Sequence, residues 1–295
     1  MRLNTERQGW FWAYLFLLPN FIGFFVLSAL PILMGFAYSL TDYDGFNQFN
    51  FLGLKNFFEM LADEYFQISL RNNIVYTLVT VPATIVIAFS LAVVINGKIP
   101  WRSYFRTVFF FPTITSLVAV GIVWSVLFNP ESGPINSVLR AVGISSPPRW
   151  LASTKSALFS IMIVSIWKSA GYYMIIILAG LQGIPNSLYE SADLDGASRY
   201  RKLCSITLPL LSPTMFFVLI VSIINSFQVF DLVSVMTNGG PGRSTNVLVY
   251  RIYQEGFVFL RQGYASAIAY FLFFMILVVT IIQFAGQKRW VNYLQ

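Results

Sequence analysis

Long apolar runs alternate with short polar segments along the chain. Six runs of about 20 residues or more cover residues 12–40, 72–95, 104–128, 156–182, 208–237 and 264–286. A helix that crosses the roughly 30 Å hydrocarbon core of a bilayer needs on the order of 20 mostly apolar residues. Turn formers and charges fill the intervals, as in NGKIPWR at 96–102 and NPESGP at 129–134. The pattern predicts an all-α membrane protein with six transmembrane helices.

Composition agrees with this pattern and excludes several kinds of catalytic and metal site. Hydrophobic residues make up 57% of the 295 residues and charged residues only 11%. Histidine is absent and Cys204 is the single cysteine, which excludes an intrachain disulfide, a Cys/His metal site and a Ser-His or Cys-His nucleophile. The net charge of +7 comes from Lys and Arg scattered between the apolar runs, which argues against a nucleic-acid partner.

Basic residues in the connecting segments indicate the orientation, because they prefer the cytoplasmic side. The apolar run that follows the N-terminal arginines is too long for a signal peptide, so the first helix is expected to stay in the membrane. With the N-terminus inside, ten Lys and Arg fall inside and eight outside, the latter over a greater length. The inside set is Arg2, Arg7, Lys98, Arg102, Arg106, Arg199, Arg201, Lys202, Lys288 and Arg289. We therefore expect a multi-pass plasma-membrane protein with both termini in the cytoplasm.

Local signals refine this outline. Prolines interrupt the predicted helices, for example Pro82 and Pro112, and produce either broken helices of the kind found in transporters or ordinary packing kinks. In the first outside segment, apolar residues recur at helical spacing over 54–65, which predicts a short helix at the outer membrane surface.

The segment 185–209 concentrates charge in an otherwise apolar chain. Its sequence, PNSLYESADLDGASRYRKLCSITLP, runs from polar residues through a glycine to an amphipathic stretch and a proline that enters the fifth run. The pattern predicts two short helices joined at Gly196, since glycine accepts a positive φ without steric cost. A docking surface for a soluble partner and a solvated loop both fit this pattern.

The same segment resembles the "EAA" loop of permease subunits in binding-protein-dependent ABC importers. The matching residues are Glu190, Ser191 and Ala192, then Gly196 after three intervening residues, then ITLP at 206–209 after nine more. Ser191 replaces the usual middle alanine, a small-for-small change. The blocks DGAS at 195–198, TNGGPGRSTNVLVYRIYQEGF at 237–257 and GYASA at 263–267 are similar to the carbohydrate branch and to the larger maltose permease, without the large external domain of the latter.

This resemblance implies a type I ABC importer permease fold and its partners. The expected organisation is a first transmembrane helix with an external interfacial segment over 1–71, a permease core over 72–286 and a cytoplasmic tail over 287–295. The partners would be a second permease, two ATPase subunits and an extracellular or periplasmic sugar-binding protein. ATP and Mg would bind the ATPases, because this chain has no phosphate-binding Gly-rich Lys-Ser/Thr loop and is expected to bind no cofactor. The implied coupling residues are Glu190, Ser191, Ala192, Asp195, Gly196, Ala197, Leu208 and Pro209.

Charged residues at membrane depth mark a candidate pathway, because they are expensive in lipid. Lys168 and Asp231 fall inside the fourth and fifth predicted helices. Helical spacing places a polar strip on one face of the fourth helix, and further polar residues follow in the fifth. The candidates are Ser165, Lys168, Ser169, Tyr172, Asn225, Gln228 and Asp231. Inter-helix hydrogen bonds, an ion pair between Lys168 and Asp231, or contact of Lys168 with the partner permease are alternative roles.

Three functions fit a polyhelical membrane chain, and transport of sugars fits best. A neutral oligosaccharide is the default substrate, while Lys168 leaves room for an anionic saccharide or a polyol phosphate. An ATP-independent channel and an integral membrane enzyme are the rival classes. An enzyme would need catalytic groups clustered at a membrane face, whereas the charge cluster here lacks histidine and matches a docking motif.

Overall fold

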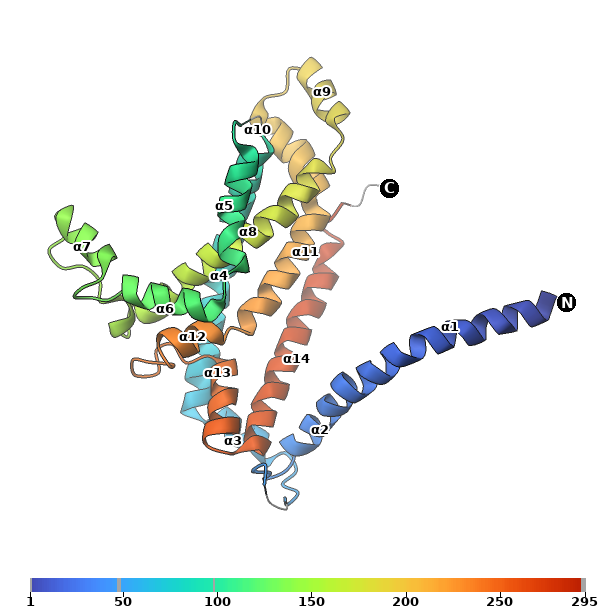
Figure 1. Ribbon diagram of the computed structural model, residues 1–295, viewed down its shortest axis with the longest axis vertical. Helices are drawn as coiled ribbons and strands as arrows, with labels where there is room; N and C mark the ends of the chain where they lie inside the picture. The colour runs from blue at the N-terminus through green and yellow to red at the C-terminus, as the bar shows by residue number, and fades with distance from the viewer. Residues whose placement is uncertain (1, 47–48, 98, 293–295) are drawn as a thin grey trace. The chain divides into compact units, whose positions relative to one another are not determined.

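The computed structural model describes residues 2–46, 49–97 and 99–292, and within them the structure is helical (Figure 1). The chain forms two compact units, one from the residues up to Asp63 together with Ile252–Phe271, the other from Glu64–Arg251 together with the residues from Leu272 onward. Lys98, residues 293–295 of the predicted tail and the side chains of Arg2 and Arg7 lie outside the described part of the structure.

The first unit contains the N-terminal helix. It runs through α1 (Arg2–Phe24), a π-helical turn η1 (Phe25–Ala29) and α2 (Leu30–Ser39). The predicted short helix follows as α3 (Lys55–Ala62), and α14 (Gln262–Gln287) begins in this unit after the π-helical turn η4 (Gln254–Val258). The Tyr270 hydroxyl on α14 donates a hydrogen bond to the Ile32 carbonyl, and its ring packs edge-on against Phe36. α2 and the start of α14 are thus joined directly.

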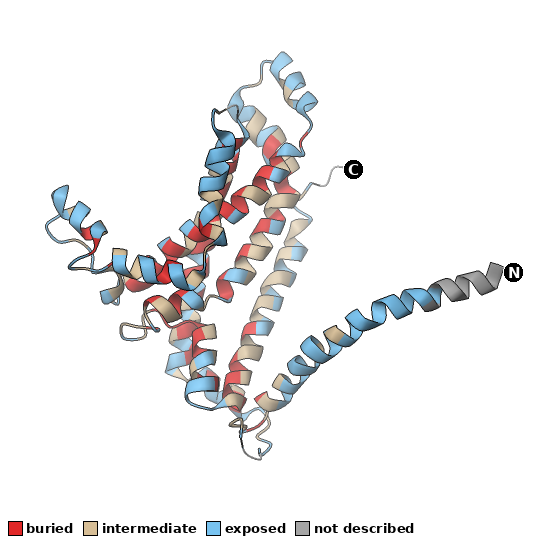
Figure 2. Ribbon diagram, viewed as in Figure 1, coloured by how far each residue is buried: buried red, intermediate tan, exposed pale blue. Residues whose placement is uncertain are grey.

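The second unit is a helical bundle. Its long helices are α4 (Glu64–Asn96), α8 (Ala157–Gln182) and α11 (Leu208–Phe227), accompanied by the C-terminal half of α14. α4 packs along α8 and α11. Burial follows these contacts along α4, α8 and α11 (Figure 2). The shorter elements are α5 (Arg102–Ile114), α6 (Leu117–Leu127), α7 (Pro134–Ala141), η2 (Trp150–Ala152), α9 (Asn186–Leu194), α10 (Arg199–Lys202), η3 (Leu203–Thr207), α12 (Asp231–Met236) and α13 (Leu248–Tyr253).

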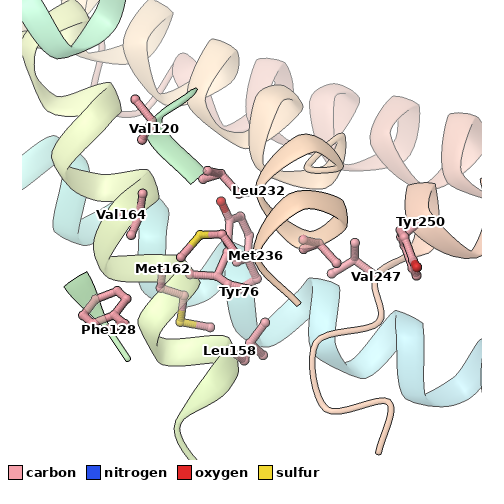
Figure 3. Packing of buried hydrophobic residues seen from close by; sticks show 12 residues of the cluster. Tyr76, Val120, Phe128, Leu158, Met162, Val164, Leu232, Met236, Val247 and Tyr250 are labelled. Atoms are coloured by element: carbon pink, nitrogen blue, oxygen red, sulfur yellow. The ribbon is translucent and has the colours of Figure 1, made fainter. Parts of the chain in front are cut away.

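Two apolar clusters stabilise the bundle. One gathers side chains of α4, α6, α8 and α12, among them Tyr76, Met162 and Leu232 (Figure 3). The other includes Ala92, Ile177 and Leu211, nearer the segment 185–209. In lipid, apolar contact alone gives little driving force, so close packing of such side chains and inter-helix hydrogen bonds hold the helices together.

The spans agree with the sequence prediction except at two breaks. Five described helices are long and apolar enough to cross a membrane, and α5 with α6 makes a sixth if that bent pair is one span. The third predicted helix, 104–128, is not straight: α5 and α6 meet at an angle of 98°. The fifth, 208–237, ends at Phe227, and Asp231 instead begins the separate helix α12. Tertiary contacts described below account for the first of these breaks.

Candidate functional site

A cavity of about 340 Å³ opens between helices of the second unit. Its walls come from α4, α8 and α11, from the turn that leads into α12, and from Leu117 at the start of α6. The lining residues are Tyr76, Thr80, Val81, Thr84, Leu117, Ser165, Lys168, Ser169, Tyr173, Ser222, Asn225, Ser226, Gln228, Val229, Phe230, Asp231 and Leu232. The lining combines hydroxyls, amides and aromatic rings with one carboxylate and one ammonium group.

Six of the seven predicted pathway residues line this cavity: Ser165, Lys168, Ser169, Asn225, Gln228 and Asp231. Tyr172 does not line it and is 41% exposed, whereas its neighbour Tyr173 lines it and is buried. The Asn225 amide donates a 3.2 Å hydrogen bond to the Tyr173 hydroxyl, which holds this ring at the cavity. Helical spacing alone favoured Tyr172, because it carries no information about the partner on α11.

The Lys168 ammonium group caps the carboxyl end of α5, which is the first half of the broken third span. Its Nζ donates hydrogen bonds to the carbonyls of Pro112, Thr113 and Thr115 at 3.0, 3.2 and 2.8 Å. The last carbonyls of a helix have no intrahelical partner and carry partial negative charge, so a cation is stabilising there. Lys168 therefore stabilises the break after α5. The predicted alternative of an ion pair with Asp231 does not occur among the described residues.

A second contact holds α5 against the same face of α8. The Thr113 hydroxyl donates a 3.1 Å hydrogen bond back to the Lys168 carbonyl. One turn along α8, a Cβ atom added to Gly171 would lie 1.9 Å from the Phe109 carbonyl oxygen. Glycine is thus required for the two backbones to approach this closely. We call Lys168 and Gly171, with the backbone of residues 109–115, the α5–α8 clasp.

Several lining side chains also bond to neighbouring helices. The Tyr76 hydroxyl donates a 2.6 Å hydrogen bond to Ser165 Oγ, which joins α4 to α8. Ser226 Oγ donates to Thr77 Oγ1 at 2.9 Å, which joins α11 to α4. Inter-helix bonding and exposure to the cavity were separate alternatives for Ser165 in the sequence analysis, and Ser165 does both, as do Tyr76 and Ser226.

Two asparagines that the sequence reasoning did not select fix the segment after α12. Asn73 Oδ1 accepts a hydrogen bond from the Leu248 backbone N–H at 3.2 Å. The Asn72 amide donates to the carbonyls of Arg243 and Asn246 at 3.1 and 2.9 Å. The available signal was a pair of asparagines in an otherwise apolar helix, since a buried amide needs partners.

The segment 185–209 contains the two short helices that the sequence predicted, α9 and α10, joined at Gly196. The Gly196 N–H donates to the Asp193 carbonyl at 3.1 Å and the Ala197 N–H to the Ala192 carbonyl at 2.9 Å. This pair of bonds is a Schellman motif, and the φ of +70° at Gly196 suits its glycine position. No atom lies within 4 Å of an added Cβ, so the backbone angle and not crowding requires glycine.

The predicted coupling residues lie on the surface of this segment. Glu190, Ser191, Asp195 and Gly196 are exposed, as is Leu208, while Ala192, Ala197 and Pro209 are partly buried. Two apolar side chains stand out: Leu194 is 90% exposed and Tyr200 is 76% exposed. Lys202 pairs with Asp193 at 2.6 Å, and the hydroxyls of Tyr189 and Thr207 are 3.0 Å apart, which ties α9 to the start of α11. An ordered polar surface with exposed apolar side chains is suited to docking.

A polar cavity among membrane-spanning helices and an ordered hydrophilic loop between two spans are features expected of a transport permease. The model of the family "Binding-protein-dependent transport system inner membrane component" matches residues 72–292, and the chain belongs to this family. It is therefore a multi-pass inner-membrane permease of ABC importers and not an enzyme, and ATP hydrolysis belongs to a separate subunit.

Known relatives cover nearly the whole chain. The probable ABC transporter permease protein YesP of Bacillus subtilis is 36% identical, over 95% of this chain and 92% of the relative. The trehalose/maltose transport system permease protein MalF of Thermococcus litoralis is 33% identical, over 92% and 91%. A chain of a bacterial alginate ABC transporter, solved in complex with an alginate pentasaccharide-bound periplasmic protein, superposes with a TM-score of 0.84 at 24% identity, covering 98% of both chains. The predicted fold class is confirmed.

Proposed function

We propose that this chain forms one half of the translocation pathway of a carbohydrate importer and is driven through the segment 185–209. One observation carries the proposal: the two helices that flank this segment, α8 and α11, also line the cavity. Figure 1 shows α9 and α10 at one end of these helices. A displacement of the segment is therefore transmitted along continuous helices to the cavity walls.

The proposal includes the partners that such an importer needs. A cytoplasmic ATPase would bind the exposed face of α9, with Glu190 facing a basic group of that subunit and Gly196 maintaining the corner. Both termini then lie in the cytoplasm. A second permease supplies the other half of the pathway, and a second ATPase subunit pairs with the first. An extracellular or periplasmic binding protein delivers the substrate. Support comes from the family description, which names dependence on a binding protein, and from the name of the trehalose/maltose relative.

The cavity lining supports a saccharide as substrate. Tyr173 and Phe230 offer aromatic surface for the C–H face of a sugar ring, while Ser169, Gln228 and Asp231 offer polar groups for its hydroxyls. Ligand sites of this kind combine apolar walls with a few polar groups that fix orientation.

Reconstitution tests the proposal. The tagged chain is purified from its native membranes with the subunits that it retains, and the complex is placed in proteoliposomes with the binding protein. We expect uptake of labelled saccharide that requires ATP and the binding protein together. Uptake that continues at the same rate without ATP would instead establish a channel, and recovery of this chain without any ATPase would contradict the proposal.

A further inference from the structure

The two charged side chains of the cavity differ in what they offer a substrate. Lys168 is 9% exposed, and its three hydrogen bonds go to the carbonyls of Pro112, Thr113 and Thr115. An ammonium group has three N–H donors, so none is left for a ligand. The partial negative charge of the α5 carboxyl end also offsets its positive charge. Although Lys168 lines the cavity, it offers little to an anion.

Asp231 shows the opposite arrangement. It is an exposed residue at the start of α12 and lines the cavity. Within the described part of the chain, its carboxylate has neither a hydrogen bond nor a salt bridge. An ionised carboxylate only accepts hydrogen bonds, and those bonds are stronger than neutral ones. The charge that an incoming substrate meets in this cavity is therefore negative.

The neighbouring groups complement an uncharged polyol. Tyr173 accepts a hydrogen bond from Asn225, which leaves its own O–H free to donate to a sugar oxygen. Ser169 and Gln228 add groups that both donate and accept. Such groups can either donate a hydrogen bond to a sugar hydroxyl or accept one from it. A substrate carboxylate or phosphate instead needs hydrogen-bond donors and positive charge around it.

We infer that this cavity selects an uncharged saccharide over one that carries a carboxylate or phosphate, and that Asp231 is the residue that discriminates. This inference rests on the proposed function. A substrate anion placed within about 6 Å of Asp231 would be repelled, and at an effective dielectric constant of about 20 this repulsion changes the rate by roughly tenfold to a hundredfold. The carboxylate of Asp231 instead accepts hydrogen bonds from the hydroxyls of a neutral sugar.

A charge-matched substrate pair tests this inference. The probes are the aldonamide and the aldonate of a neutral oligosaccharide that the binding protein takes, which differ in charge but hardly in shape. Uptake of each is measured in the reconstituted complex, with the affinity of the binding protein for each determined separately. We expect the wild type to prefer the aldonamide by about tenfold or more after that correction.

Substitutions assign the preference to Asp231. Asp231→Asn keeps the shape and removes the charge, so the preference should fall by roughly tenfold, whereas Asp231→Glu should retain it. Glu131→Gln removes an exposed carboxylate that does not line the cavity, and should leave the preference unchanged. An aldonate transported as fast as the aldonamide, or an equal preference in Asp231→Asn and wild type, would overturn the inference while leaving the importer function intact. Failure of every saccharide to enter would refute the proposed function itself.

Discussion

Replacing Gly171 by valine is expected to prevent the permease from assembling, with a loss of at least about 4 kcal/mol of stability. The first added atom, Cβ, would lie 1.9 Å from the Phe109 carbonyl oxygen and 2.8 Å from its carbonyl carbon. Both are backbone atoms of α5, so no side chain can move aside. The measurement is the yield of monodisperse complex after detergent extraction, followed by size-exclusion chromatography.

A second glycine provides the control for this substitution. Gly286 lies on α14 with no atom within 4 Å of an added Cβ, so Gly286→Val should extract in the wild-type amount. Normal yield of Gly171→Val would show that α5 and α8 do not approach as closely as described. The clasp would then not hold the broken span.

Gly196→Pro is expected to lower transport and transport-coupled ATP hydrolysis by about tenfold or more, with the amount of permease in the membrane unchanged. Proline fixes φ near −65° and lacks the N–H group, whereas Gly196 has a φ of +70° and donates to the Asp193 carbonyl. The corner between α9 and α10 would open and displace Glu190 from its docking position. Because the corner is exposed and no atom lies within 4 Å of an added Cβ, the bundle itself should fold normally.

Gly143→Pro is a matched control, because Gly143 closes α7 with the same backbone motif. Its φ is +94°, and its N–H and that of Ile144 donate to the carbonyls of Arg140 and Leu139, both at 3.0 Å. This substitution damages an equivalent corner outside the segment 185–209 and should preserve coupled hydrolysis. Equal uncoupling by both variants, or full transport by Gly196→Pro, would count against a specific role of the segment. Glu190→Ala should reproduce the coupling defect without a backbone change.

The features that the sequence predicted well depend on local rules. The spans are predicted by the length of apolar sequence that is needed to cross a bilayer. The segments that connect them are recognised by their glycine, proline and charged residues. The corner at Gly196 was predictable for the same reason, since a glycine between two amphipathic stretches commonly ends a helix. The polar strip of α8 followed from helical periodicity, and Ser165, Lys168 and Ser169 all line the cavity.

The features that sequence reasoning missed depend on partners distant in the chain. The 98° bend after α5 is stabilised by Lys168, more than fifty residues further along, and Pro112 alone did not distinguish a break from a kink. The same bonds decide that Lys168 faces α5 carbonyls and not Asp231. Tyr173 is selected over Tyr172 by Asn225 on another helix. Periodicity places a residue on a face but does not reveal what that face contacts.

The segment 185–209 is expected to be the surface on which an ATPase docks, and a photocrosslink from α9 tests this docking directly. Leu194, which is 90% exposed, is changed to cysteine in a Cys204→Ser background, because Cys204 is itself exposed. The thiol introduced at position 194 is labelled with a benzophenone maleimide in the intact complex. Val142→Cys, at a position 70% exposed after α7, serves as the control.

After illumination, the crosslinked product is identified by mass spectrometry. We predict an adduct between position 194 and the ATPase subunit, and no ATPase adduct from position 142. An adduct of position 194 with the binding protein, or labelling of that thiol by an impermeant reagent added outside intact cells, would contradict ATPase docking at this segment.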